Sequence, residues 1–315
     1  MSQAESGKLD LKKLRLVARL VLGGASAVFV AVACYKLATR WQSGKVTVSW
    51  PWLVASGLPI ALGTVILALS WKWLMERMVG KKLPVVPCLT LHFESQMARY
   101  TPGKVGIPLV RMAGAEKLGV PAAVAGYSVL TESISMVAVG GVVGFAALLA
   151  MNSGTASVTE TFGKVGLLGL LAFVAVTLVL VLVDRRLLPA FVTKLMRAEA
   201  GTGPLVPRRG PLAHALYWLT WAAHGYLAAR SVGISSVHAW SGSAFYVLAP
   251  IAGILALATP SGIGVREAVL SMGLAPLVGT APAVAAAIVS RAVSLLVDCL
   301  VWAFGRVVLS GRSSP

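Results

Sequence analysis

Residues 99–111 read RYTPGKVGIPLVR, and they hold three positive charges, two prolines and two glycines between long apolar runs. Proline and glycine interrupt a helix. The stretch therefore marks either a cytoplasmic loop between two membrane spans or broken backbone held inside the membrane. The two interpretations share the same local composition, so the rest of the chain has to distinguish them.

The composition is that of a polytopic membrane protein. Hydrophobic residues make up 57% of the chain, charged residues make up only 12%, and the mean hydropathy is +0.82. Apolar runs longer than about 18 residues recur, and each is long enough to cross the hydrocarbon core of a bilayer as a helix. We therefore predict an all-α polytopic membrane protein with a single membrane domain over residues 1–315.

The net charge of +17 comes mainly from basic residues at the ends of the apolar runs. This pattern follows the preference for positive charge on the cytoplasmic side, and it also suits contact with anionic lipids. We predict no nucleic-acid partner. Cysteines 34, 88 and 299 lack the spacing of metal ligands, so we predict no metal site and no cofactor. No motif supplies a credible nucleophile, so we predict that the chain is not an enzyme.

A second stretch, LATPSGIGVREAV at residues 257–269, repeats the features of the first. Thr259-Pro260 follows Thr101-Pro102 by 158 residues, and each proline lies 28 residues beyond the end of an apolar run, at Leu74 or Val232. Each half thus holds two spans, a broken segment and a closing span. We predict a first repeat over residues 1–152 and a second over 165–315, with a cytoplasmic linker at 185–210.

The charge pattern then predicts the topology. If both broken segments are re-entrant, six of the eight apolar segments span the membrane, both termini are cytoplasmic, and the second repeat is inverted relative to the first. Inverted repeats whose broken helices meet near the bilayer midplane are typical of transporters. We expect a bacterial inner-membrane protein with spans near residues 16–37, 52–74, 120–151, 165–183, 211–232 and 282–309.

Irregular backbone cannot face lipid, because each unpaired amide there costs several kcal/mol, so the breaks must be buried or line a cavity. The residues that we expect to shape the turns are Pro102, Gly103, Gly106, Pro260, Gly262 and Gly264. The basic residues that we expect to bind an anionic head group are Arg99, Lys104, Arg111, Arg266 and Arg291. The cytoplasmic-loop interpretation stays open for the first three of these.

Ionisable side chains inside apolar spans are costly and are usually functional or paired. Glu132 lies 30 residues after Pro102 and Arg291 lies 31 after Pro260, so we predict that these two pair across the repeats. Asp298 is the alternative partner of Arg291.

Two further carboxylates lie close to the breaks. We expect Glu94 to pair with Arg99 or Arg111. Glu267 either pairs with Arg266 or leaves that arginine free to contact substrate. The tryptophans are interpreted as anchors at the membrane interface.

The two motifs resemble those of the lysylphosphatidylglycerol synthase transmembrane-region family. RYTPGKVGIPLVR is similar to the first signature of the family and ATPSGIGVRE to the second, with Gly-Val-Arg-Glu the most specific part. The resemblance covers roughly residues 10–310. In that family the membrane region is associated with flipping aminoacylated phosphatidylglycerol, and a soluble domain performs the aminoacyl transfer. The family often shows an acidic-Arg pair where this chain has Glu132-Ser133.

The resemblance implies lipid handling without the soluble aminoacyl transferase, since the sequence ends at Pro315. Our first hypothesis is a flippase that moves an anionic phospholipid or a lipid-linked head group through a central polar cavity. The alternative is a non-transporting membrane subunit that presents a lipid to a partner lipid-modifying enzyme. A membrane-embedded transferase is a third hypothesis. Small residues such as Gly140-Gly141 are compatible with a homo-oligomer.

Overall fold

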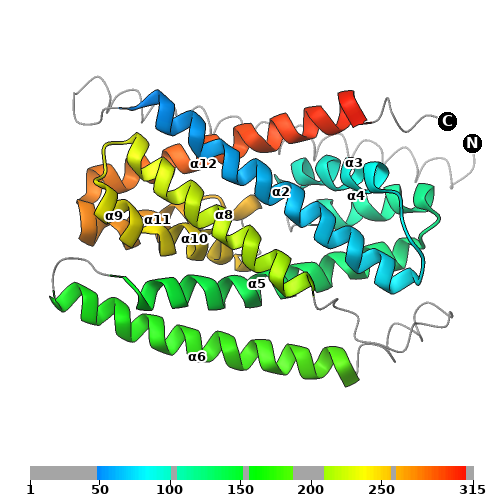
Figure 1. Cartoon of the computed structure of the whole chain (residues 1–315), viewed down its shortest axis with the longest axis horizontal. Coiled ribbons are helices and arrows are strands. Elements are labelled where there is room, and N and C mark those ends of the chain that lie inside the picture. The colour runs from blue at the N-terminus through cyan, green and yellow to red at the C-terminus, as the bar shows by residue number, and fades with distance from the viewer. Residues whose placement is uncertain (1–47, 101–104, 152–155, 187–208, 257–259, 310–315) are drawn as a thin grey trace, which may run out of the picture.

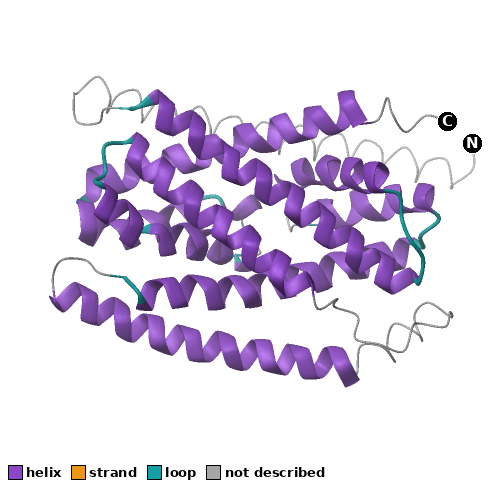
Figure 2. Ribbon diagram, viewed as in Figure 1, coloured by secondary structure: helices purple, strands orange, loops and turns teal. Residues whose placement is uncertain are grey.

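The computed structural model describes residues 48–100, 105–151, 156–186, 209–256 and 260–309. Every regular element within these ranges is a helix (Figure 2), which confirms the all-α prediction for this part of the chain. The expected span near residues 16–37 and the centre of the linker lie outside the described residues.

The first half has long helices on either side of an interrupted segment. The elements are α2 (Trp50–Val79), α3 (Val85–Gln96), η1 (Met97–Tyr100), α4 (Gly106–Ala115), η3 (Glu116–Leu118) and α5 (Ala122–Leu149). Pro51 lies in the first turn of α2, where its missing N–H costs no hydrogen bond, and Gly80 ends the helix in the left-handed conformation. The helices expected near residues 52–74 and 120–151 are thus present, and the chain between them is broken as predicted.

The second half also holds long helices on either side of an interrupted segment. Its elements are α6 (Ala156–Arg186), α8 (Arg209–Ser231), α9 (Ser236–Ser241), α10 (Ser243–Leu255), η4 (Pro260–Gly262), α11 (Val265–Val278), α12 (Thr280–Phe304) and η5 (Gly305–Leu309). The predicted break between residues 255 and 265 therefore separates α10 from α11.

Five segments of the described chain are long and apolar enough to cross a membrane: Trp50–Val79, Ala122–Leu149, Val158–Val179, Ser236–Leu255 and Thr280–Val307. Helix α8 is not among them, because its arginines and histidines lower its hydropathy. His214 and His224 are nevertheless buried, so both histidines of α8 face the protein interior. The count of six spans and two re-entrant segments stays a prediction.

Helices α2 and α8 run antiparallel through the bundle (Figure 1). At one end of the pair, the Ser49 N–H donates to the Ser231 carbonyl at 2.8 Å. At the other end, Lys81 Nζ donates to the Gly119 carbonyl at 2.9 Å, which places the end of the first broken segment beside the end of α2. Figure 1 shows α3 and α4 toward this second end of the molecule, whereas α9, α10 and α11 lie toward the first.

The break in the second half depends on glycine. Ser261 and Gly262 both adopt positive φ, at 49° and 68°, and Gly264 follows at 86°. A Cβ added at Gly262 would overlap the backbone of Gly253 in α10. Two backbone segments therefore approach so closely that no side chain fits between them.

Candidate functional site

Arg111 of α4 lies in a buried polar cluster in the first half, and it is only 2% exposed. Its guanidinium forms an ion pair with Glu132 of α5, Nε donates to Ser95 Oγ at 3.1 Å, and Nη2 lies 2.9 Å from His92 Nδ1. The guanidinium also lies over the ring of Trp71, 4.7 Å from its centroid. This cation is therefore fully compensated by a carboxylate, hydrogen bonds and an aromatic face.

Arg266 of α11 occupies a similar environment in the second half, and it is 7% exposed. The guanidinium lies over Trp221, 4.6 Å from the ring centroid, and it donates to Ser290 Oγ at 3.0 Å and to Ser294 Oγ at 3.4 Å. Hydroxyl groups thus stand where the first half has a carboxylate. Within the described part of the chain, no carboxylate lies at ion-pair distance from Arg266.

Arg291 of α12 connects the second break to the first. Its Nε lies 3.6 Å from Glu267 Oε1, Nη1 donates to the Ser261 carbonyl at 3.3 Å, and the guanidinium lies 5.6 Å from the ring centroid of Tyr100. Glu267 therefore pairs with Arg291 and not with the adjacent Arg266, because successive residues on a helix point in different directions.

Two predicted pairings of Arg291 are wrong. Glu132 pairs with Arg111, since α4 packs against α5 within the same half. Asp298 pairs with Arg99, whose Nη1 lies 3.3 Å from Oδ2, and the Tyr100 hydroxyl donates to the same oxygen at 2.9 Å. The last turn before the first break is thus held by α12.

The prediction for Glu94 is also wrong. Its carboxylate lies 3.3 Å from Arg306 Nη1, and this arginine side chain is 59% exposed. Arg99 and Arg111 have other partners, and the two residues of this pair lie near the surface, where an ion pair contributes little to stability.

Sequence reasoning missed two features of the site. Trp71 and Trp221 are buried stacking surfaces for the arginines, not interface anchors. His224 is buried and lies 2.9 Å from the Ser56 carbonyl through Nδ1 and 2.8 Å from Ser290 Oγ through Nε2. A carbonyl only accepts, so Nδ1 carries the proton and Nε2 accepts from Ser290, which leaves the serine oxygen to accept from Arg266. The signal was a histidine within an otherwise apolar face of a helix.

The predicted turn residues are only partly described. Pro102, Gly103 and Lys104 lie outside the described residues, while Gly106 opens α4 and Pro260 opens η4. The α11 N-terminus is already capped, because the Gly264 N–H donates to Glu267 Oε2 at 2.7 Å. The backbone amide of Gly264 is thus occupied by a carboxylate of the same helix and is not free to bind an anion.

The charges around the two breaks, apart from the Arg111 cluster, do not balance. Arg99, Arg266 and Arg291 contribute three positive charges, whereas Asp298 and Glu267 contribute two negative ones. Among the described residues this region therefore carries one uncompensated positive charge, located at Arg266, while the Arg111 cluster is neutral. An arrangement of this kind favours the binding of an anion.

Comparison with known proteins places this architecture in a family. Residues 16–301 match the family described as Lysylphosphatidylglycerol synthase TM region. No curated protein matches the chain. The match includes both breaks and all five candidate spans up to residue 301. It confirms the resemblance predicted from the two motifs: the chain is a multi-pass membrane protein that belongs to the lysylphosphatidylglycerol synthase TM region family.

Proposed function

We propose that this protein is a flippase of the bacterial inner membrane, which moves an anionic phospholipid or a lipid-linked head group. The observation that carries the proposal is the buried guanidinium of Arg266, which has no carboxylate partner among the described residues. An uncompensated charge inside a membrane protein is costly, and a bound phosphate would compensate it. The family membership supports a role related to membrane lipids.

The groups around Arg266 suit a phosphate. A guanidinium has five N–H donors in a fixed plane, and Arg266 uses two nitrogens for Ser290 and Ser294. The hydroxyl hydrogens of both serines are engaged, by His224 Nε2 and by the Arg291 carbonyl, so the donors for an anion are the remaining N–H groups of Arg266. The stack on Trp221 fixes the plane of the guanidinium and thus the direction of its donors.

The arrangement of the breaks supports movement of the lipid and not only binding. The first broken segment lies toward one end of the bundle and α9–α11 lie toward the opposite end (Figure 1), as two inverted repeats would place them. The breaks contact each other through Arg291 and Tyr100. In the proposed mechanism, the head group passes between the Arg266 and Arg111 sites while its apolar chains stay in the bilayer.

The experiment is lipid movement in proteoliposomes that contain labelled phosphatidylglycerol, with labelled phosphatidylcholine as the zwitterionic comparison. We expect Arg266→Ala and Arg111→Ala to slow the movement of phosphatidylglycerol by about tenfold or more, since each removes a charge-assisted contact. Arg306→Ala is the matched control, because this arginine forms a surface pair with Glu94. Its rate should stay within about twofold of the intact protein.

Two outcomes would contradict the flippase proposal. One is equal movement of labelled phosphatidylglycerol by the intact protein and both variants. The other is the absence of movement together with arginine-dependent binding of phosphatidylglycerol, which would support the alternative, a subunit that presents a lipid to a partner enzyme.

A further inference from the structure

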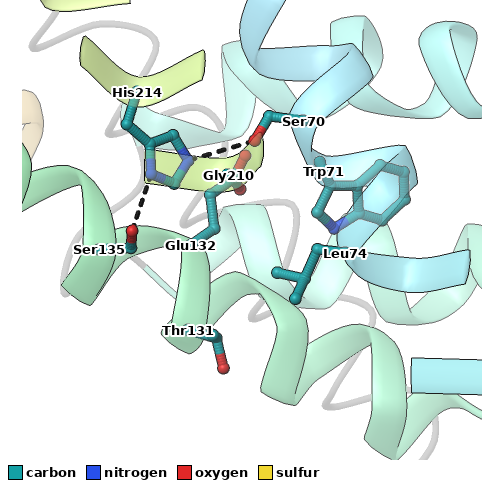
Figure 3. Close-up of a pocket in the computed structure, with 8 residues that line it drawn as sticks. All are labelled: Ser70, Trp71, Leu74, Thr131, Glu132, Ser135, Gly210 and His214. Atoms are coloured by element: carbon teal, nitrogen blue, oxygen red, sulfur yellow. Dashed lines mark hydrogen bonds between the residues drawn. The ribbon is translucent and has the colours of Figure 1, made fainter. Parts of the chain in front are cut away.

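A small cavity adjoins the buried pair of Arg111 and Glu132. Figure 3 shows Glu132, His214, Ser70 and Ser135 around this cavity, which three helices enclose. Its volume is about 10 Å³. A single water molecule needs a space of this order.

Glu132 has one carboxylate oxygen to spare. The side chain is buried, and Oε2 is engaged by Arg111. Oε1 is fully buried and has no hydrogen-bond partner within the described structure. A buried acceptor without a partner is costly, and either a water molecule or a proton on Oε1 would remove this cost.

His214 and two serines can carry a proton to this position. His214 Nδ1 lies 2.8 Å from Ser135 Oγ and its Nε2 lies 3.4 Å from Ser70 Oγ. A hydroxyl can donate or accept, so both ring nitrogens can exchange roles without movement of the ring. These groups come from α8, α5 and α2, and all three line the cavity that Glu132 also lines.

We infer that Glu132 is a proton-binding site that competes with the lipid phosphate for Arg111, and that lipid movement is therefore coupled to protons. This inference rests on the proposed function. One proton adds to Oε1, the carboxylate becomes a neutral acid, and Arg111 keeps its charge of +1. A phosphate with one negative charge then takes the place of the carboxylate.

The charges of the two states support this coupling. Without lipid, the Arg111–Glu132 pair is neutral. With one proton on Glu132 and one anionic head group on Arg111, the site is neutral again. Both states can therefore exist inside a low-dielectric membrane without an uncompensated charge. The lipid and the proton then move together, and the coupled step carries no net charge.

Among the carboxylates near this cavity, Glu132 is the one that we expect to bind the proton. On the other elements packed near it, the titratable and charged groups include Arg111 of α4, His92 of α3, Arg99 of η1, His214 and His224 of α8, the Lys72–Glu76 pair of α2 and the exposed Glu160–Lys164 pair of α6. Helix α10 contributes no charged side chain. Glu76 and Glu160 each pair with a lysine of their own helix.

The transport experiment uses phosphatidylcholine vesicles with a minor share of labelled phosphatidylglycerol and a proton-sensitive dye inside. A pH gradient is imposed while the membrane potential is clamped at zero. For one proton per lipid, the ratio of labelled lipid between leaflets should shift by up to about tenfold per pH unit. Lipid should gather in the leaflet toward which protons flow. Glu132→Gln should abolish this shift, whereas Glu160→Gln, the exposed control on α6, should leave it unchanged.

A second measurement does not depend on transport. In detergent, phosphatidylglycerol should increase the infrared carbonyl band of a protonated carboxylic acid in the intact protein and in Glu160→Gln, but not in Glu132→Gln. His214→Asn keeps the Arg111–Glu132 pair and should slow proton uptake by about tenfold. If Glu132→Gln does not fold, the spectra of the intact protein and the His214→Asn kinetics still test the inference.

The outcomes separate the inference from the proposed function. Lipid movement that does not depend on the pH gradient, with no infrared change, overturns the proton coupling but not the flippase proposal. No lipid movement, with a lipid-induced carboxylic-acid band, overturns the flippase and supports proton binding in competition with lipid. A band that persists in Glu132→Gln overturns the assignment to Glu132.

Discussion

The guanidinium of Arg291 lies over the ring of Tyr100, 5.6 Å from its centroid, although the two residues belong to opposite halves of the chain. Arg291 also holds the second break through the Ser261 carbonyl, and the Tyr100 hydroxyl donates to Asp298 at 2.9 Å. The two breaks are therefore joined through α12, which supplies both Arg291 and Asp298. A change at either break therefore alters the contacts of α12.

Tyr100→Phe tests this connection. The variant keeps the ring beneath Arg291 but loses the hydrogen bond to Asp298, so we expect a loss of about 1–2 kcal/mol in the free energy of unfolding. Tyr100→Ala also loses the ring and should cost more. Unfolding in detergent by heat or denaturant measures both. Equal stability of the intact protein and Tyr100→Ala would contradict the connection.

The buried pair of Arg111 and Glu132 predicts a non-additive double variant. Arg111→Met or Glu132→Leu alone leaves an unpaired buried charge and should destabilise the protein by about 3–5 kcal/mol. The double variant should be more stable than either single one, because no charge remains. The exposed pair of Glu160 and Lys164 is the control, and its removal should cost less than about 0.5 kcal/mol. Additive losses at the buried pair would contradict the prediction.

Gly262 and Gly264 allow strain and steric overlap to be measured separately. Both have positive φ, but a Cβ at Gly264 meets nothing within 4 Å, whereas a Cβ at Gly262 overlaps Gly253. Gly264→Ala should cost about 1–3 kcal/mol from backbone conformation alone. Gly262→Ala should cost more, because α10 and η4 must also separate. Thermal unfolding of the two variants gives the comparison, and equal losses would show that the close approach contributes nothing.

The topology predicts that the two halves expose their broken segments on opposite sides of the membrane. Lys117, at the end of the first broken segment, and Ser236, at the start of α9, are both exposed. With the native cysteines replaced, Lys117→Cys should react with an impermeant thiol reagent only from the cytoplasmic side. Ser236→Cys should react only from the other side. Reaction of both positions from one side would exclude the inverted repeat.

Local signals in the sequence were enough to predict the helices and the breaks. Thr-Pro followed by glycines interrupts an apolar run whatever packs around it, so the breaks near Pro102 and Pro260 follow from the covalent structure. The partner of each arginine does not follow from the covalent structure, because it depends on how each helix is rotated against its neighbours. Glu132 and Arg291 occupy matching positions in the two halves, and each faces the break of its own half: Glu132 meets Arg111, and Arg291 meets Glu267.

The tryptophans were misinterpreted for a similar reason. Trp71 lies near the end of an apolar run, where interface anchors are common, and no local pattern distinguishes an anchor from a buried partner of an arginine. Only the packing of α4 against α3 and α5 brings Arg111 over its ring.

The contact of Gly262 with Gly253 has a mechanical consequence. With backbone against backbone and no side chain between them, the turn at η4 cannot rock independently of α10. We expect α10 and η4 to move together as one unit whenever the second half changes shape.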